Sequence, residues 1–100
     1  MVSYLVEAYS PIDGEELAKA VSRIRVAARA MSRQGLAVRH VKAILVPGDE
    51  TCFHLVDAPS ANAVEELIRR AGLSCTRVAE AVELPNPRVE KEDRRCISLA

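Results

Sequence analysis

Two amphipathic helical patterns occur in this chain, and each lies between segments rich in β-forming residues. In the first, apolar residues recur at spacings of three and four, at Leu17, Val21, Ile24, Ala28 and Met31. In the second, they recur in the same way at Val64, Leu67, Ile68 and Ala71. These stripes predict helices over residues 15–34 and 61–71. Gly35 and Gly72 are typical C-terminal caps, and Ser60 is a candidate N-cap of the second helix.

Four segments around these helices predict strands, at residues 2–9, 36–46, 51–57 and 76–84. The sequence Pro-Gly-Asp-Glu at 47–50 has turn chemistry, so the second and third strands form an antiparallel hairpin. The order is strand, helix, strand, strand, helix, strand, which predicts an α+β fold, the ferredoxin-like α/β plait. Right-handed crossovers place both helices on one face of a four-stranded antiparallel sheet and leave the other face open.

The composition fits one globular domain that binds neither nucleic acid nor a membrane. Fourteen basic and fourteen acidic residues leave a net charge of zero, and two tyrosines, one phenylalanine and no tryptophan offer little stacking surface. No segment approaches the roughly 18 apolar residues of a membrane span, and the N-terminus lacks the pattern of a signal peptide. Three cysteines at irregular spacings favour reduced thiols. We therefore expect a cytoplasmic protein.

The composition changes after Leu84, where two prolines and a run of alternating charges precede a short apolar end. This change predicts a ferredoxin-like domain over residues 1–84 and a polar C-terminal tail over residues 85–100. The tail is either solvated or an arm that docks its end on a neighbouring subunit or across the sheet.

Cys52 and His54 are the residues that most suggest chemistry. They are two apart in an expected strand, so their side chains share one face. A thiolate and a neutral imidazole are good ligands for zinc, nickel or copper, and the pair is therefore the candidate metal site. Glu50, at the turn, is two residues before Cys52, so its side chain is expected on the same face. Glu7 lies on the first strand, which neighbours the third in a plait. The candidate binding residues are thus Glu7, Glu50, Cys52 and His54, with a divalent transition metal as the candidate cofactor and no catalytic residue assigned.

The second histidine is expected to lie apart from this pair. A hairpin centred near Gly48 and Asp49 places His40 opposite residues 57 and 58. At roughly 3.4 Å per residue, this is more than about 10 Å from His54, too far to share one ion.

The sequence leaves open which face of the sheet the pair occupies, because a turn one residue longer exchanges the faces. The apolar Phe53 and Leu55 favour the helix-covered face for those two residues. Cys52, His54 and Val56 would then line the open face.

The segment PGDETCFHLVDAPSANAVEELIRRAGLSCTRVAEAVEL, residues 47–84, resembles the second half of a family of small bacterial ferredoxin-like proteins of unknown function. The P-x-D-E-T-C-F segment is the most specific part, and the first half agrees more loosely through YLVEAY and VRHVKAILVP. The family is similar to a group described as nickel-binding ferredoxin-like proteins. This resemblance, which covers residues 2–84, implies a homodimer with a role in metal binding. Glu7, Glu50 and Cys52 match the family, and His54 is particular to this chain.

Taken together, these features favour a dimeric protein that binds a metal ion or a small molecule at the open sheet face. The alternatives are a dimeric plait enzyme, in which His54 or His40 moves a proton on a small organic substrate, and a structural or interaction subunit.

Overall fold

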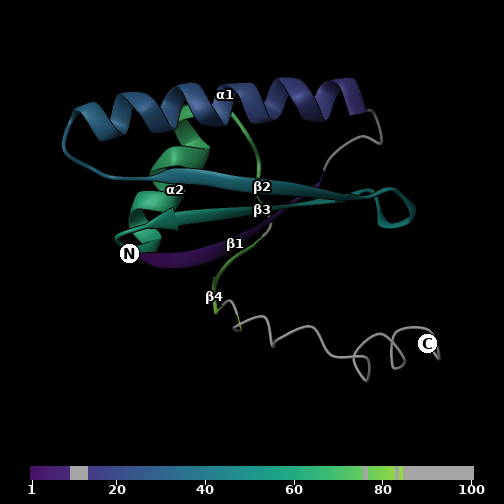
Figure 1. Cartoon of the computed structure of the whole chain (residues 1–100). Helices are drawn as coiled ribbons and strands as arrows, with labels where there is room; N and C mark the ends of the chain where they lie inside the picture. Colours follow the sequence, from purple (N-terminus) through teal and green to yellow (C-terminus); the bar gives the residue numbers. More distant parts are fainter. Residues whose placement is uncertain (10–13, 76, 83, 85–100) are drawn as a thin grey trace, which may run out of the picture.

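The computed structural model describes residues 1–9, 14–75, 77–82 and 84. Its elements follow one another in the predicted order (Figure 1). They are β1 (Val2–Tyr9), α1 (Gly14–Arg33), β2 (Arg39–Val46), the 3-10 turn η1 (Pro47–Asp49), β3 (Thr51–Ala58), α2 (Ala61–Arg70) and β4 (Arg77–Ala81). The tail predicted at residues 85–100 lies outside the described part of the chain.

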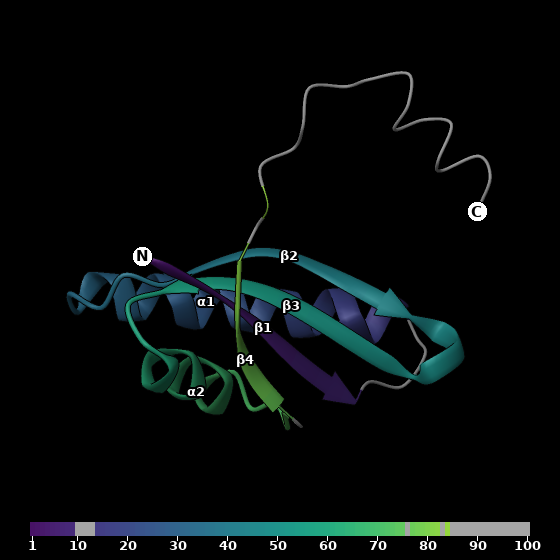
Figure 2. The ribbon, with the colours of Figure 1, turned by 90° about the horizontal axis from the view of Figure 1, so that it is seen from below.

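The four strands form one antiparallel sheet in the order β2-β3-β1-β4, so β1 and β3 are central. When the sheet is seen from its other side, α1 crosses behind the strands and α2 lies beside them (Figure 2). Both helices pack into the same core, and the other side of the sheet carries no described helix. The predicted fold class, a ferredoxin-like α+β plait, is therefore confirmed. Within the described residues, neither helix has the length and apolar character needed to cross a membrane.

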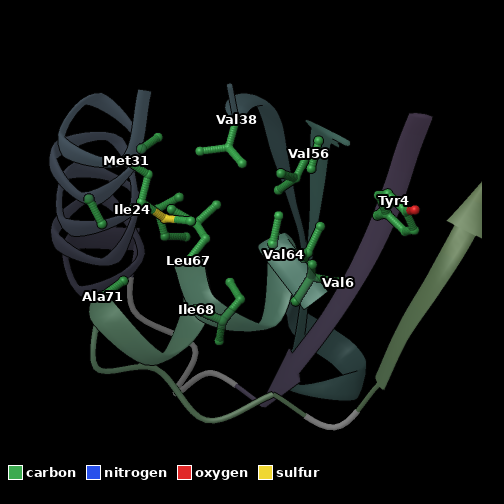
Figure 3. Close-up of a cluster of buried hydrophobic side chains, with 14 residues drawn as sticks. Tyr4, Val6, Ile24, Met31, Val38, Val56, Val64, Leu67, Ile68 and Ala71 are labelled. Carbon is green, nitrogen blue, oxygen red and sulfur yellow. The ribbon is translucent and has the colours of Figure 1, made fainter. Parts of the chain in front are cut away.

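The core fills the space between the helices and the sheet (Figure 3). Ile24 and Met31 of α1 and Leu67 of α2 are fully buried there. They face Val6 of β1 and Val56 of β3, which are also fully buried. Burying a large aliphatic side chain contributes about 1.5–3 kcal/mol, so this layer is the main source of stability.

The helix ends follow the capping residues expected from the sequence. The Ser60 hydroxyl accepts a hydrogen bond from the Ala63 N–H at 3.2 Å, as an N-cap does. Gly35 and Gly72 have φ angles of 93° and 73°, which glycine adopts without strain.

Two strand ends differ from the prediction. β2 begins at Arg39 instead of residue 36, because the chain before it is bound to the end of α1. The Leu36 N–H donates to the Met31 carbonyl at 2.9 Å, and the Ser32 hydroxyl bonds the backbone of Val38. β4 ends at Ala81, and the side chains beyond it at positions 82 and 84 are exposed.

Candidate functional site

Cys52 and His54 lie on the helix-covered face of β3, and the prediction that they line the open face is wrong. Their exposed fractions are 0% and 2%, whereas Phe53 and Leu55 are only partly buried on the opposite face. Both faces of this central strand are apolar, so hydrophobicity alone could not distinguish them. The covered face takes the side chains of Cys52, His54, Val56 and Ala58.

The prediction that His40 lies more than about 10 Å from His54 is also wrong. From Lys42 to Val46, β2 pairs with β3 in the register expected for the hairpin, but a β-bulge between His40 and Lys42 shifts the register by one residue. His40 therefore lies opposite Val56, and its side chain turns to the covered face with 7% exposed. A one-residue insertion has this effect because side chains alternate between faces.

The three side chains form a continuous buried row. The Nε2 atom of His40 and the Nδ1 atom of His54 are 3.1 Å apart, and the two rings meet edge to face at 5.2 Å. On the other side of the same ring, the Nε2 atom of His54 lies 3.5 Å from the Cys52 Sγ. The Cys52 thiol also lies 3.9 Å from the Phe53 carbonyl oxygen. His54 is thus the central member, with one partner on each ring nitrogen.

The row is held in its neutral form. Burial, with the nearby His40, lowers the pKa of His54 from its ordinary value of 6.5 to about 4. Burial, with the positive charge of Arg25, also lowers the pKa of His40. Burial raises the pKa of the Cys52 thiol. Near pH 7 the row therefore holds two neutral imidazoles and a thiol, and Cys52 has none of the thiolate character of a reactive cysteine.

Glu7 and Glu50 do not join this row. Glu7 lies opposite Phe53 and Arg77, on the open face of the sheet. Glu50 is exposed at the end of the hairpin turn, where its φ of 50° is left-handed. Within the described part of the chain, no group of three or more histidine, cysteine, aspartate and glutamate side chains is placed to hold a metal ion.

A cavity of about 240 Å³ lies where the row ends, between α1 and the start of β2. It is lined by Arg25, Ala28, Arg29, Ser32, Val38, Arg39 and His40. This site was not predicted from the sequence. The sequence nevertheless contains a pattern that indicates it. Positions 25, 29 and 32 of α1 are four and three residues apart, so their polar side chains share one side of the helix.

The open face of the sheet has a different character. A hollow of about 230 Å³ there is lined by Ser3, Leu5, Lys42, Ile44, Leu55, Ala81 and Val82. Ile44 is 50% exposed and Val82 is 79% exposed. Charged residues of both signs lie on the same face, because Glu7 pairs in register with Arg77, and Asp57 with Arg39.

The chain matches no family model, and no curated protein matches it. Among solved structures, it is similar to SCO4226 from Streptomyces coelicolor A3(2), with a TM-score of 0.71 and 20% sequence identity. The similarity covers 83% of this chain and 99% of that one. At this identity the likeness bears on the fold alone, and it agrees with the plait described above.

Proposed function

We propose that this chain is a small-ligand-binding protein that acts as a dimer, with its ligand in the cavity beside His40. The observation that carries the proposal is the Nδ1 atom of His40, which is buried and has no hydrogen-bond partner among the described residues. Leaving such an atom unpartnered costs about 1–3 kcal/mol, and such atoms are uncommon in folded proteins. His40 also forms part of the cavity wall. A small turn of its ring toward the cavity would let a ligand bound there supply the missing partner of Nδ1.

The buried row allows His40 to meet either a donor or an acceptor. In one neutral arrangement, the thiol of Cys52 donates to Nε2 of His54, whose Nδ1–H donates to Nε2 of His40. The Nδ1 of His40 then carries a proton and is a donor. In the other arrangement, Nε2–H of His40 donates to Nδ1 of His54, whose Nε2–H points at the sulfur, and the Nδ1 of His40 is an acceptor. Both arrangements hold the same number of protons.

A divalent metal at Cys52 and His54 is the second candidate. The Sγ–Nε2 separation of 3.5 Å is close to that of two neighbouring ligands on a tetrahedral zinc ion, about 3.5 Å from Zn–S and Zn–N bonds of about 2.3 and 2.0 Å. The described residues of one chain supply half of the four ligands that a structural site uses. This candidate, whether the ion is zinc or nickel, therefore needs ligands from elsewhere.

A titration followed through the imidazole nitrogens tests the proposal. We expect at least one of two small probes, inorganic phosphate and uncharged glycerol, to shift the Nδ1 signal of His40 in ¹⁵N-correlated NMR spectra. The signals of His54 and Cys52 should move less, since they lie deeper in the row. If Zn²⁺ or Ni²⁺ instead shifts Nε2 of His54 and raises the melting temperature, and Cys52→Ser abolishes the effect, the metal candidate is correct. If neither probe moves the His40 signal, the ligand site is not at this cavity.

The open sheet face supports the dimer. Its apolar centre brings Leu5, Ile44 and Leu55 together, and grouped apolar residues on a surface mark an interaction site more often than single ones do. The acidic and basic residues around it suit a second copy of the same face, because a two-fold axis brings each sign opposite the other. We place the protein in the cytoplasm, where Cys52 and Cys75, which are free thiols in this structure, stay reduced.

The mass in solution tests the dimer. We expect light scattering to give twice the chain mass of 10.9 kDa. Ile44→Glu should halve that mass, because it places a charge in the centre of the face. Val26→Glu is the matched control, since Val26 is 61% exposed but lies on α1, away from the open face. A dimer that persists in Ile44→Glu would show that the interface lies elsewhere.

A further inference from the structure

We propose that the ligand of the cavity beside His40 carries an oxyanion, a carboxylate or phosphate group, which Arg25, Arg29 and Nδ1 of His40 bind together. This inference rests on the proposed function above and adds the chemical class of the ligand. It follows from the charge, the spacing and the hydrogen-bonding capacity of the residues around the cavity.

The cavity wall concentrates positive charge in a chain whose net charge is zero. Three of the seven lining residues are arginines, and none is acidic. Arg39 pairs with Asp57 through an N–O distance of 3.1 Å, so its charge is partly compensated. No ion pair is seen for Arg25 or Arg29 within the described part of the chain. These two guanidinium groups are therefore available to an anion.

The spacing of the two arginines brings their charges onto one stretch of α1. Residues four apart on a helix are neighbours, and like charges at this spacing destabilise a helix by a few tenths of a kcal/mol. The charge of Arg25 also acts on His40, where it helps to lower the pKa of the imidazole. Arg25, Arg29 and His40 thus meet in a region of positive potential, and an anion placed there removes the repulsion.

The hydrogen-bond donors around the cavity are of the kinds that bind oxyanions in proteins. A guanidinium group binds a carboxylate or phosphate through two parallel N–H···O bonds. The Nδ1 of His40 adds an N–H donor in the arrangement in which Cys52 and His54 donate along the row toward it. The Ser32 hydroxyl also lines the cavity, but it is already hydrogen-bonded to the backbone of Val38, so we assign it no contact with the ligand.

The size of the cavity limits the ligand. At about 240 Å³ it lies just below the range of about 300–1,000 Å³ typical of sites for drug-sized molecules. Ala28 and Val38 provide the apolar part of the wall. The space therefore holds one anionic group and a short apolar part, and because the cavity opens to solvent, the rest of a larger ligand would lie outside it.

The test is a titration of the full-length protein at low ionic strength with inorganic phosphate and, separately, malonate as a carboxylate probe. We expect both anions to shift the Nδ1 signal of His40 in NMR spectra. The double variant Arg25→Gln/Arg29→Gln should weaken binding by at least about tenfold, because charge-assisted hydrogen bonds are lost. Lys19→Gln removes a positive charge from the same helix outside the cavity, where Glu15 and Glu16 already compensate it, and should leave the affinity nearly unchanged.

The results separate this inference from the proposed function. If glycerol shifts the His40 signal and neither anion does, the cavity binds a ligand but not an oxyanion, and only this inference fails. Anion binding that the double variant retains in full would also overturn it. If neither anion nor glycerol reaches His40, both proposals fail together. A preference for phosphate over malonate, or the reverse, identifies which anionic group the site takes.

Discussion

Lowering the pH from 7 to 4 should reduce the free energy of unfolding by about 3 kcal/mol through His54 alone. In the folded chain, burial holds the pKa of His54 at about 4, against an ordinary 6.5 that applies when the chain is unfolded. Below pH 6.5 the unfolded chain therefore takes up a proton that the folded chain excludes. The stabilisation is fully present above pH 6.5 and is lost as the pH falls toward 4. At about 1.4 kcal/mol for each pH unit, the difference amounts to about 3 kcal/mol.

Urea unfolding between pH 4 and 7.5, with a chelator present, measures this loss. Carboxylates also titrate in this range, so the reference is the double variant His40→Gln/His54→Gln, which keeps every carboxylate and replaces both imidazoles by amides. We expect the unmodified chain to lose about 3 kcal/mol more than the variant. The lowered pKa of His40 acts in the same direction. Equal losses in the two proteins would show that the buried histidines do not control the acid stability.

Leu67→Ala should destabilise the chain by about 3 kcal/mol. Leu67 is fully buried where α2 meets α1 and the sheet, beside Ile24 and Met31. Removing three carbons there loses their transfer free energy and leaves a cavity, which together cost about 2–5 kcal/mol in well-packed cores. For a domain of this size, the melting temperature should fall by roughly 10–20 °C.

Val26→Ala is the matched control for this prediction. It also shortens an apolar side chain on a helix, but Val26 is 61% exposed. Its effect should stay within about 0.5 kcal/mol, because no buried contact is lost. If Leu67→Ala were as mild as Val26→Ala, measured by calorimetry under the same conditions, the packing of α2 described above would be incorrect.

The fold could be predicted because several local signals agree. The stripes of α1 and α2, the glycines that end them and the turn at Pro47–Asp49 all specify the same order of elements. The ends of β2 and β4 were less predictable. They depend on contacts between different elements, such as that of the Ser32 hydroxyl with the backbone of Val38. The periodicity within one helix or strand does not predict such contacts.

The site could be predicted only in part. Cys52 and His54 were identified as a pair because alternation along a strand depends on nothing but sequence distance. Their face was predicted wrongly, since β3 is apolar on both sides. The contact with His40 was missed because it depends on a bulge, and no glycine or proline marks that position. Arg25 and Arg29 were not predicted as site residues, because exposed arginines on a helix usually indicate only its solvent-facing side.

The bulge in β2 has a consequence for comparing this chain with others of the same fold. If β2 paired regularly at its present length, Val41 would lie opposite Val56 and His40 would lie opposite Asp57, on the open face. Deleting Val41 would also remove the bulge, but it would leave His40 opposite Val56, on the covered face. A homologue of the same length that lacks the bulge can thus keep the same histidine in an alignment and yet present it on the open face instead of at the cavity. For such relatives, the presence or absence of the bulge between His40 and Lys42 is more informative about the site than the identity of the residue aligned with His40.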